Sequence, residues 1–128
     1  MEVAALTEAE IHFSVPGRPV PKERARVRKD GHRYTPRRTA EYEELVGWYC
    51  RQAMGTHPPL DGPVMVCICL HYRTDAPLAD VDNVAKAILD GMEGVAYRSD
   101  RQVSGLMVFR RARTVRNEYA EVTVWPSI

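Results

Sequence analysis

The chain of 128 residues has the length of one globular domain, and its 45% apolar and 27% charged residues are typical of a protein with one hydrophobic core. It contains no apolar run approaching the roughly 18–20 residues of a membrane-spanning helix. The N-terminus lacks the basic-then-apolar pattern of a secretory signal, and the three cysteines include no C-x-x-C pair. These features argue against a membrane protein or an exported disulfide-rich protein, and they favour a reducing cytoplasm.

The net charge of +1 hides a strong asymmetry along the chain. Residues 18–38 contain nine basic and two acidic side chains, so this stretch carries +7 and the remainder carries −6. A local positive charge of this size favours a polyanionic partner. The alternative, a solvated loop with long charged side chains, stays open from the charge pattern alone.

Residues 1–10 are predicted to be a loose or weakly helical lead-in, followed by a single domain over residues 11–128. Alternating apolar side chains at Ile11, Phe13 and Val15 predict a strand that Pro16-Gly17 ends. A basic loop then runs over about residues 17–38. A connection of ~20 residues without regular structure is uncommon in a compact domain unless it is functional or disordered.

Two amphipathic helices and three further strands are predicted after the basic loop. The first helix begins with Thr39 as its N-cap and ends before Gly55. Its apolar residues recur at helical spacing: Tyr42, Leu45, Val46, Tyr49, Ala53 and Met54. The remaining elements are a central strand over 64–72, a helix over 82–93, and strands near 103–110 and 118–125. The order β-α-β-α-β-β predicts an α+β fold in which two helices pack on a small mixed sheet.

Cys67, Cys69 and His71 share one face of the predicted central strand, which raises the question of a zinc site. Three ligands at a spacing of two on one strand are poorly placed to surround a tetrahedral ion. The pattern therefore favours a second, semi-buried sheet face over zinc.

The segment D-V-D-N-V-A-K-A-I-L-D, residues 80–90, has the pattern of a metal-dependent catalytic site. Asp82, Lys86 and Asp90 lie on one polar face of the predicted helix, and Asp80 directly precedes it. Paired carboxylates provide the hard oxygen ligands that Mg²⁺ or Mn²⁺ selects, and a nearby lysine can stabilise charge on a phosphate. The alternative is structural, with the aspartates capping the helix and Lys86 paired with Asp90 on the surface.

Asp100, in the segment Y-R-S-D-R-Q-V, is a candidate third ligand. An acidic residue that enters a strand after the helix is expected to return to the N-terminal end of that helix. Asp100 has an equally ordinary interpretation as a turn residue.

Three blocks of this sequence resemble the RusA-type Holliday junction resolvases, which are small endodeoxyribonucleases of bacteria and their phages. The blocks are V-P-G-R-P-V-P-K-E-R-A-R-V with Y-T-P-R-R-T-A-E-Y-E, then D-V-D-N-V-A-K-A-I-L-D-G-M, then D-R-Q-V, and the likeness covers about residues 11–125. It implies that Asp80, Asp82 and Asp100 are the metal-binding catalytic carboxylates and that Lys86 is needed for cleavage. Many relatives have two adjacent acids before x-Q-V; here Ser99 stands first, so the role is carried to Asp100.

The resemblance also implies a homodimer that binds four-way DNA junctions and makes paired nicks with Mg²⁺, or with Mn²⁺ in its place. The expected function is junction resolution in DNA recombination and repair, in the cytoplasm of a bacterium or from a phage genome. Two alternatives are a nuclease for flaps or forks and a non-catalytic DNA-binding protein.

Phosphate contact becomes the favoured interpretation of the basic loop. The residues expected to contact DNA there are Lys22, Arg24, Arg26, Arg28, Arg33, Arg37 and Arg38. Tyr34 is a candidate for stacking on an exposed base, with simple packing as the alternative. Further along the chain, Arg110, Arg111, Arg113 and Arg116 are candidates for a second phosphate-contacting patch.

Overall fold

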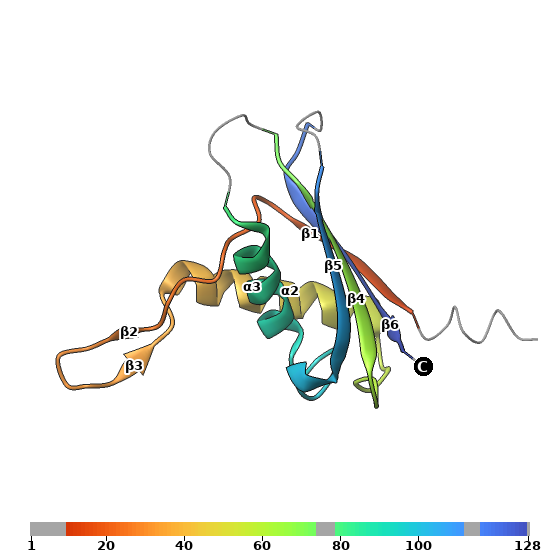
Figure 1. The fold of residues 1–128 in the computed structure, drawn as a ribbon, viewed down its shortest axis with the longest axis horizontal. Coiled ribbons are helices and arrows are strands. Elements are labelled where there is room, and N and C mark those ends of the chain that lie inside the picture. The colour runs from red at the N-terminus through yellow and green to blue at the C-terminus, as the bar shows by residue number, and fades with distance from the viewer. Residues whose placement is uncertain (1–9, 74–78, 112–115, 128) are drawn as a thin grey trace, which may run out of the picture.

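The computed structural model describes residues 10–73, 79–111 and 116–127 and shows a four-stranded sheet with two helices on one face (Figure 1). The strands are β1 (Ile11–Pro16), β4 (Val64–His71), β5 (Val103–Arg110) and β6 (Tyr119–Pro126), in the spatial order β1-β6-β4-β5. The helices are α2 (Arg37–Met54) and α3 (Val81–Met92). The predicted α+β class and element order are confirmed. The predicted lead-in lies almost entirely outside the described residues.

Strand β4 is central, as its apolar composition predicts, because it pairs with β6 on one side and β5 on the other. The pairing with β6 is antiparallel and the pairing with β5 is parallel. Val64, Val66, Ile68 and Leu70 are fully buried beneath the helices. The side chains between them point to the opposite face, here called the outer face, where Met65, Cys67 and Cys69 are half-buried. Among the described residues, no helix is long and apolar enough to cross a lipid bilayer.

Helix α2 differs from its predicted form at both the cap and the buried stripe. It begins at Arg37 with Pro36 at the N-cap position, so Thr39 lies inside the first turn. The Thr39 hydroxyl donates to the Pro21 carbonyl oxygen (3.1 Å) and accepts from the Glu23 amide (3.2 Å). The predicted capping role is therefore wrong, because this hydroxyl instead ties the preceding loop to the helix.

The buried stripe of α2 runs through residues spaced three or four apart: Thr39, Tyr42, Val46, Cys50 and Met54. The predicted core positions Leu45 and Ala53 are exposed instead. Both lie next to the stripe on the helix surface, and the stripe continues through Thr39 and Cys50, whose small polar groups are accommodated in the core.

Helix α3 buries Val84, Ile88 and Met92, which confirms its predicted apolar stripe. It also packs very closely on α2. A Cβ added at Gly91 would lie 2.7 Å from the Glu43 carbonyl oxygen, so only glycine fits at this contact. The close approach brings the acidic side chains of the two helices near each other.

The basic loop is not devoid of regular structure. Strands β2 (Arg26–Val27) and β3 (Arg33–Tyr34) pair as a short antiparallel hairpin, and Gly31 adopts a positive φ of 87° in its turn. Residues 24–34, here called the arm, are all exposed and project from the body of the protein (Figure 1). The arm leads directly into the N-terminus of α2.

Candidate functional site

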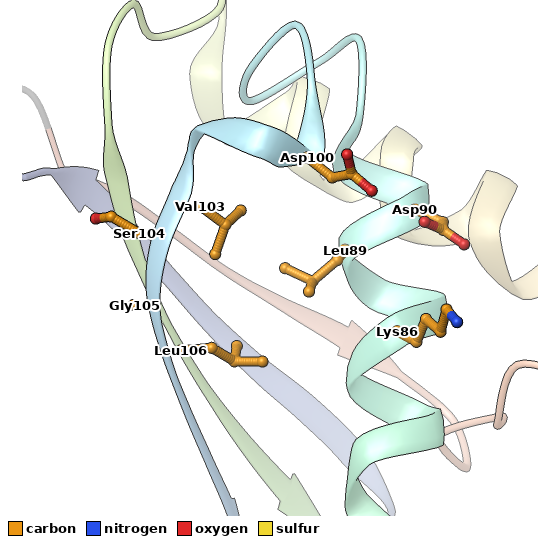
Figure 2. Close-up of a pocket in the computed structure, with 8 residues that line it drawn as sticks. All are labelled: Lys86, Leu89, Asp90, Asp100, Val103, Ser104, Gly105 and Leu106. Atoms are coloured by element: carbon orange, nitrogen blue, oxygen red, sulfur yellow. The ribbon is translucent and has the colours of Figure 1, made fainter.

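A pocket between α3 and β5 is lined by three of the residues singled out in the sequence (Figure 2). Lys86 and Asp90 border it from α3, with their charged ends pointing away from β5, and Asp100 borders it from the turn before β5 (Figure 2). The complete lining is Lys86, Leu89, Asp90, Asp100, Val103, Ser104, Gly105 and Leu106. Its floor is thus apolar and its rim carries one cation and two carboxylates.

Asp80 and Asp82 lie at the N-terminal end of α3 and do not line this pocket. Asp80 occupies the N-cap position, but its side chain makes no capping hydrogen bond. Asp82 stands in the first turn, and both residues are exposed. Asp80 therefore stands at the capping position, as the structural alternative expects, but its carboxylate does not cap the helix. Both side chains face solvent at the end of the helix where the dipole favours negative charge.

Asp100 lies at the opposite end of α3, so the expected return to the helix N-terminus is wrong. Its backbone amide donates to Oε2 of Glu93, directly beyond the last helical residue (3.0 Å). Arg110, at the far end of β5, donates to the Ala79 carbonyl oxygen beside Asp80 (3.4 Å). The two ends of the 12-residue helix are roughly 18 Å apart at 1.5 Å per residue.

The reason for this separation is the topology of the sheet. Strands β4 and β5 are parallel, and α3 is the crossover between them, so it runs in the opposite direction. A residue before α3 and a residue before β5 must then lie at opposite ends of the molecule. Among the described residues, one chain alone does not gather Asp80, Asp82 and Asp100 into a three-ligand group.

Lys86 is exposed on α3 and takes part in no ion pair within the described residues. The alternative pairing with Asp90 is not formed, because Asp90 pairs with Lys22 instead. Lys86 is thus a cation whose charge is available to a ligand on the side of α3 that faces away from β5 (Figure 2).

Lys22 holds the base of the arm against both helices. Its Nζ lies 2.5 Å from Oε2 of Glu43 on α2 and 3.0 Å from Oδ2 of Asp90 on α3. Burial acts to lower the pKa of Lys22, but the hydrogen bonds and charges of Glu43 and Asp90 outweigh it, and the pKa is raised. Lys22 therefore differs from the other predicted DNA-binding residues, because its charge is neutralised inside the protein.

The remaining predicted DNA-binding residues are exposed: Arg24, Arg26, Arg28, Arg33, Arg37 and Arg38. Arg26 lies 3.6 Å from Glu23, and Arg37 pairs with Glu41 at 2.7 Å. The Arg28 guanidinium lies over the ring of Tyr34, 5.5 Å from its centroid, so one face of this half-exposed ring is partly occupied.

Arg110, Arg111 and Arg116 are also exposed. They lie around the connection between β5 and β6, whereas Arg113 falls outside the described residues. The second basic patch thus stays a prediction.

Gln102 and Ser99 form a positioning element that the sequence reasoning missed. The Ser99 hydroxyl accepts from the Arg101 amide (3.2 Å), and the Gln102 side chain accepts from the amides of Arg98 and Ser99. The Gln102 amide also donates to the carbonyl oxygens of Leu60 and Gly62. The pattern S-x-x-Q is a capping box, and this signal was available in the sequence. Ser99 and Gln102 thus fix the turn that carries Asp100.

The chain thus forms a small α+β domain that carries exposed acidic groups on α3 and exposed basic groups on the arm. Residues 16–124 match the family model described as Endodeoxyribonuclease RusA. The match covers nearly the whole chain, so the protein belongs to the RusA endodeoxyribonuclease family. A search of the curated proteins finds no match.

The ion pairs of Lys22 predict different effects of two substitutions near the arm. Lys22→Met should lower the free energy of unfolding by about 1–3 kcal/mol, because it leaves the carboxylates of Glu43 and Asp90 facing each other in a partly buried place. Arg26→Met, on the exposed arm, should change it by less than about 0.5 kcal/mol. Urea unfolding followed by circular dichroism measures both values, and equal effects would contradict this role of Lys22.

Proposed function

We propose that this protein is a Mg²⁺-dependent endonuclease that resolves four-way DNA junctions by paired phosphodiester hydrolysis in recombination and repair. The supporting observation is the group at the N-terminus of α3, where two exposed aspartates without capping bonds precede an exposed lysine. Membership of an endodeoxyribonuclease family gives this group its chemical context. A cytoplasmic location in a bacterium, or an origin in a phage, belongs to the same proposal.

The donor set of Asp80 and Asp82 fits a hard divalent cation. Mg²⁺ is typically held by one or two carboxylates, with waters and substrate phosphate completing six ligands. When bound there, the ion would supply a more acidic water and would offset charge on the phosphate. Lys86, one helical turn from Asp82, is placed to hold a phosphate oxygen against the site.

The arm and the start of α2 are proposed to bind the sugar–phosphate backbone. Their arginines are exposed, and they lie on a projecting hairpin whose base is anchored by Lys22 and Thr39. Phosphate contacts give affinity without sequence readout, as expected for a protein that recognises branched structure. In this proposal Lys22 anchors the arm, and Arg24, Arg26, Arg28 and Arg33 make the contacts.

A homodimer is proposed to complete each metal site. Strand β5 is at the edge of the sheet, and Leu106, Met107 and Phe109 on it are large apolar residues that are 42–51% exposed. A long apolar edge strand of this kind favours pairing with another strand. A two-fold axis beside the middle of β5, perpendicular to the strand, would place the second copy's β5 and α3 alongside in the opposite direction. Asp100 of that copy would then lie near Asp80 and Asp82 of the first.

Asp82→Asn should abolish cleavage and preserve binding. We expect the rate on a labelled four-way junction with Mg²⁺ to fall by about 10²-fold or more, since a ligand of the ion is removed. Junction affinity measured without Mg²⁺ should be unchanged or higher, because a negative charge near phosphate is removed.

Glu44→Gln, on the exposed surface of α2, is the matched control and should cleave normally. Cleavage by Asp82→Asn at the wild-type rate would exclude the metal role. A preference for flaps or forks over four-way junctions would change the substrate, and no Mg²⁺-dependent product on any branched DNA would leave a binding protein only.

Mixed dimers test whether each site draws on two chains. A heterodimer of Asp82→Asn and Asp100→Asn chains, purified through two different tags, should regain one intact site and nick junctions once. In that heterodimer the Asp100→Asn chain provides Asp80 and Asp82 to the intact site, and the Asp82→Asn chain provides Asp100. Both homodimers should be inactive.

A heterodimer of Asp80→Asn and Asp82→Asn chains is the control. It should stay inactive, because each of its sites retains one damaged carboxylate whichever chain supplies residue 100. If the first heterodimer is as inactive as this control, the shared site is wrong even where the chain still dimerises and cleaves.

Arg26→Gln should weaken junction binding to a similar extent for every junction sequence. The slope of log affinity against log salt concentration should become shallower by about 0.9 for each phosphate that the protein no longer neutralises. Arg51→Gln, at the opposite end of α2 from the arm, should leave the slope unchanged. Filter binding over a range of salt concentrations measures both, and equal slopes for Arg26→Gln and wild type would exclude this contact.

A further inference from the structure

The outer face of the sheet carries a cluster of potential metal ligands that the nuclease proposal does not use. Cys69 and His71 lie two residues apart on β4, and Glu121 lies on the neighbouring strand β6. One donor atom from each residue falls within 4.8 Å of the other two. This cluster stands on the opposite side of the sheet from α2 and α3.

The pairing of β4 with β6 creates the cluster. Cys69 is directly opposite Glu121, and His71 is opposite Tyr119. The objection that one strand cannot surround a tetrahedral ion does not apply, because the third donor comes from a second strand. Cys67 shares the face with Cys69, but it is opposite Thr123, which offers no carboxylate.

His71 is the most constrained of the three residues. Its side chain is only 8% exposed, its ring stacks on Tyr119 with centroids 4.2 Å apart, and its Nε2 lies 2.7 Å from Oε1 of Glu121. Its Nδ1 is buried without a hydrogen-bond partner among the described residues. A buried ring nitrogen without a partner carries a free-energy cost, so the ring is held in place by Tyr119 and by the Glu121 contact at Nε2 and not by a bond at Nδ1.

We propose that Cys69, His71 and Glu121 bind one Zn²⁺ ion that joins β4 to β6. A thiolate, an imidazole and a carboxylate are the three ligand types that Zn²⁺ takes in proteins, at about 2.0–2.3 Å, and a water can fill the fourth tetrahedral position. Two ligand atoms of a tetrahedral Zn²⁺ stand roughly 3.3–3.5 Å apart, so Nε2 of His71 and Oε1 of Glu121 must separate slightly from their present 2.7 Å. The Cys69 thiol, which lies within 4.8 Å of both, must take up the same spacing, and side-chain rotation provides both movements. Coordination releases the Cys69 thiol proton to solvent.

The mixed donor set selects the metal. Mg²⁺ prefers oxygen ligands alone, whereas a thiolate together with an imidazole favours Zn²⁺. The site is therefore distinct in chemistry from the aspartates at α3. It lies at the end of β4 from which the chain continues, through Tyr72 and Arg73, toward Asp80.

Co²⁺ is the probe for a spectroscopic test on the full-length protein, because a thiolate ligand gives it a charge-transfer band that carboxylates alone do not. After chelator treatment and dialysis, we expect Co²⁺ to produce this band with one ion per chain, and one equivalent of Zn²⁺ to remove it. Zn²⁺ should also raise the thermal unfolding midpoint of wild type, since it binds the folded state.

Cys69→Ser should lose the band completely, and Glu121→Gln should weaken Co²⁺ binding by about 10-fold or more. Cys67→Ser is the matched control, because it removes a half-buried thiol from the same strand and face, two residues away. It should keep the band and the stoichiometry. Circular dichroism confirms that each variant folds.

The proposal is overturned if wild type shows no thiolate band with Co²⁺ at 1:1 or in excess. It is equally overturned if Cys67→Ser loses the band as Cys69→Ser does, since that result indicates adventitious binding to surface thiols. An unchanged Co²⁺ affinity in Glu121→Gln would exclude Glu121 as a ligand, and its contact with His71 would then be an ion pair only. The nuclease assays do not enter this test, so the two proposals succeed or fail separately.

Discussion

The parallel pairing of β4 with β5 is the constraint from which the arrangement of the acidic residues follows. Parallel neighbours need a crossover, and α3 is that crossover, so its direction is opposite to both strands. Asp80 and Asp82 then stand where β4 has ended, and Asp100 stands where β5 begins. Local changes in loop conformation cannot remove a separation that is one helix long.

A second consequence of the crossover is the tight contact between the two helices. Gly91 brings α3 so close to α2 that carboxylates from both helices meet at Lys22. The same lysine fixes the root of the arm, and its backbone amide donates to the Asn83 carbonyl oxygen in the first turn of α3 (2.8 Å). The root of the arm and the acidic end of α3 are thereby held together.

Much of the fold could be predicted from the sequence, because its main signals are local. The alternation in β1, the continuous apolar run of β4 and the stripe Val84, Ile88 and Met92 are periodic patterns that report burial directly. The positions of Leu45 and Thr39 were predicted wrongly, because both depend on contacts with segments distant in the chain. Thr39, for example, lies in the core because Pro21 and Glu23 provide partners for its hydroxyl.

The candidate site was predictable in its residue types and less so in its geometry. In the structure Asp80 and Asp82 stand at the N-terminal end of α3, and Lys86 follows one turn after Asp82 on the same helix. The place of Asp100 depends on strand direction, which no residue pattern near it encodes. Likewise, Glu121 joins Cys69 and His71 only through the register between β4 and β6, a long-range property.

The arm is held together by a ladder of only two residue pairs, Arg26 with Tyr34 and Val27 with Arg33. A hairpin this short has little stability of its own in water. Ion pairs of Lys22 hold the root of the arm, but few interactions fix the conformation of its tip. The tip of such a hairpin can adjust to the surface that it meets, and the conformational entropy that it loses on becoming ordered is a cost that only the added contacts offset.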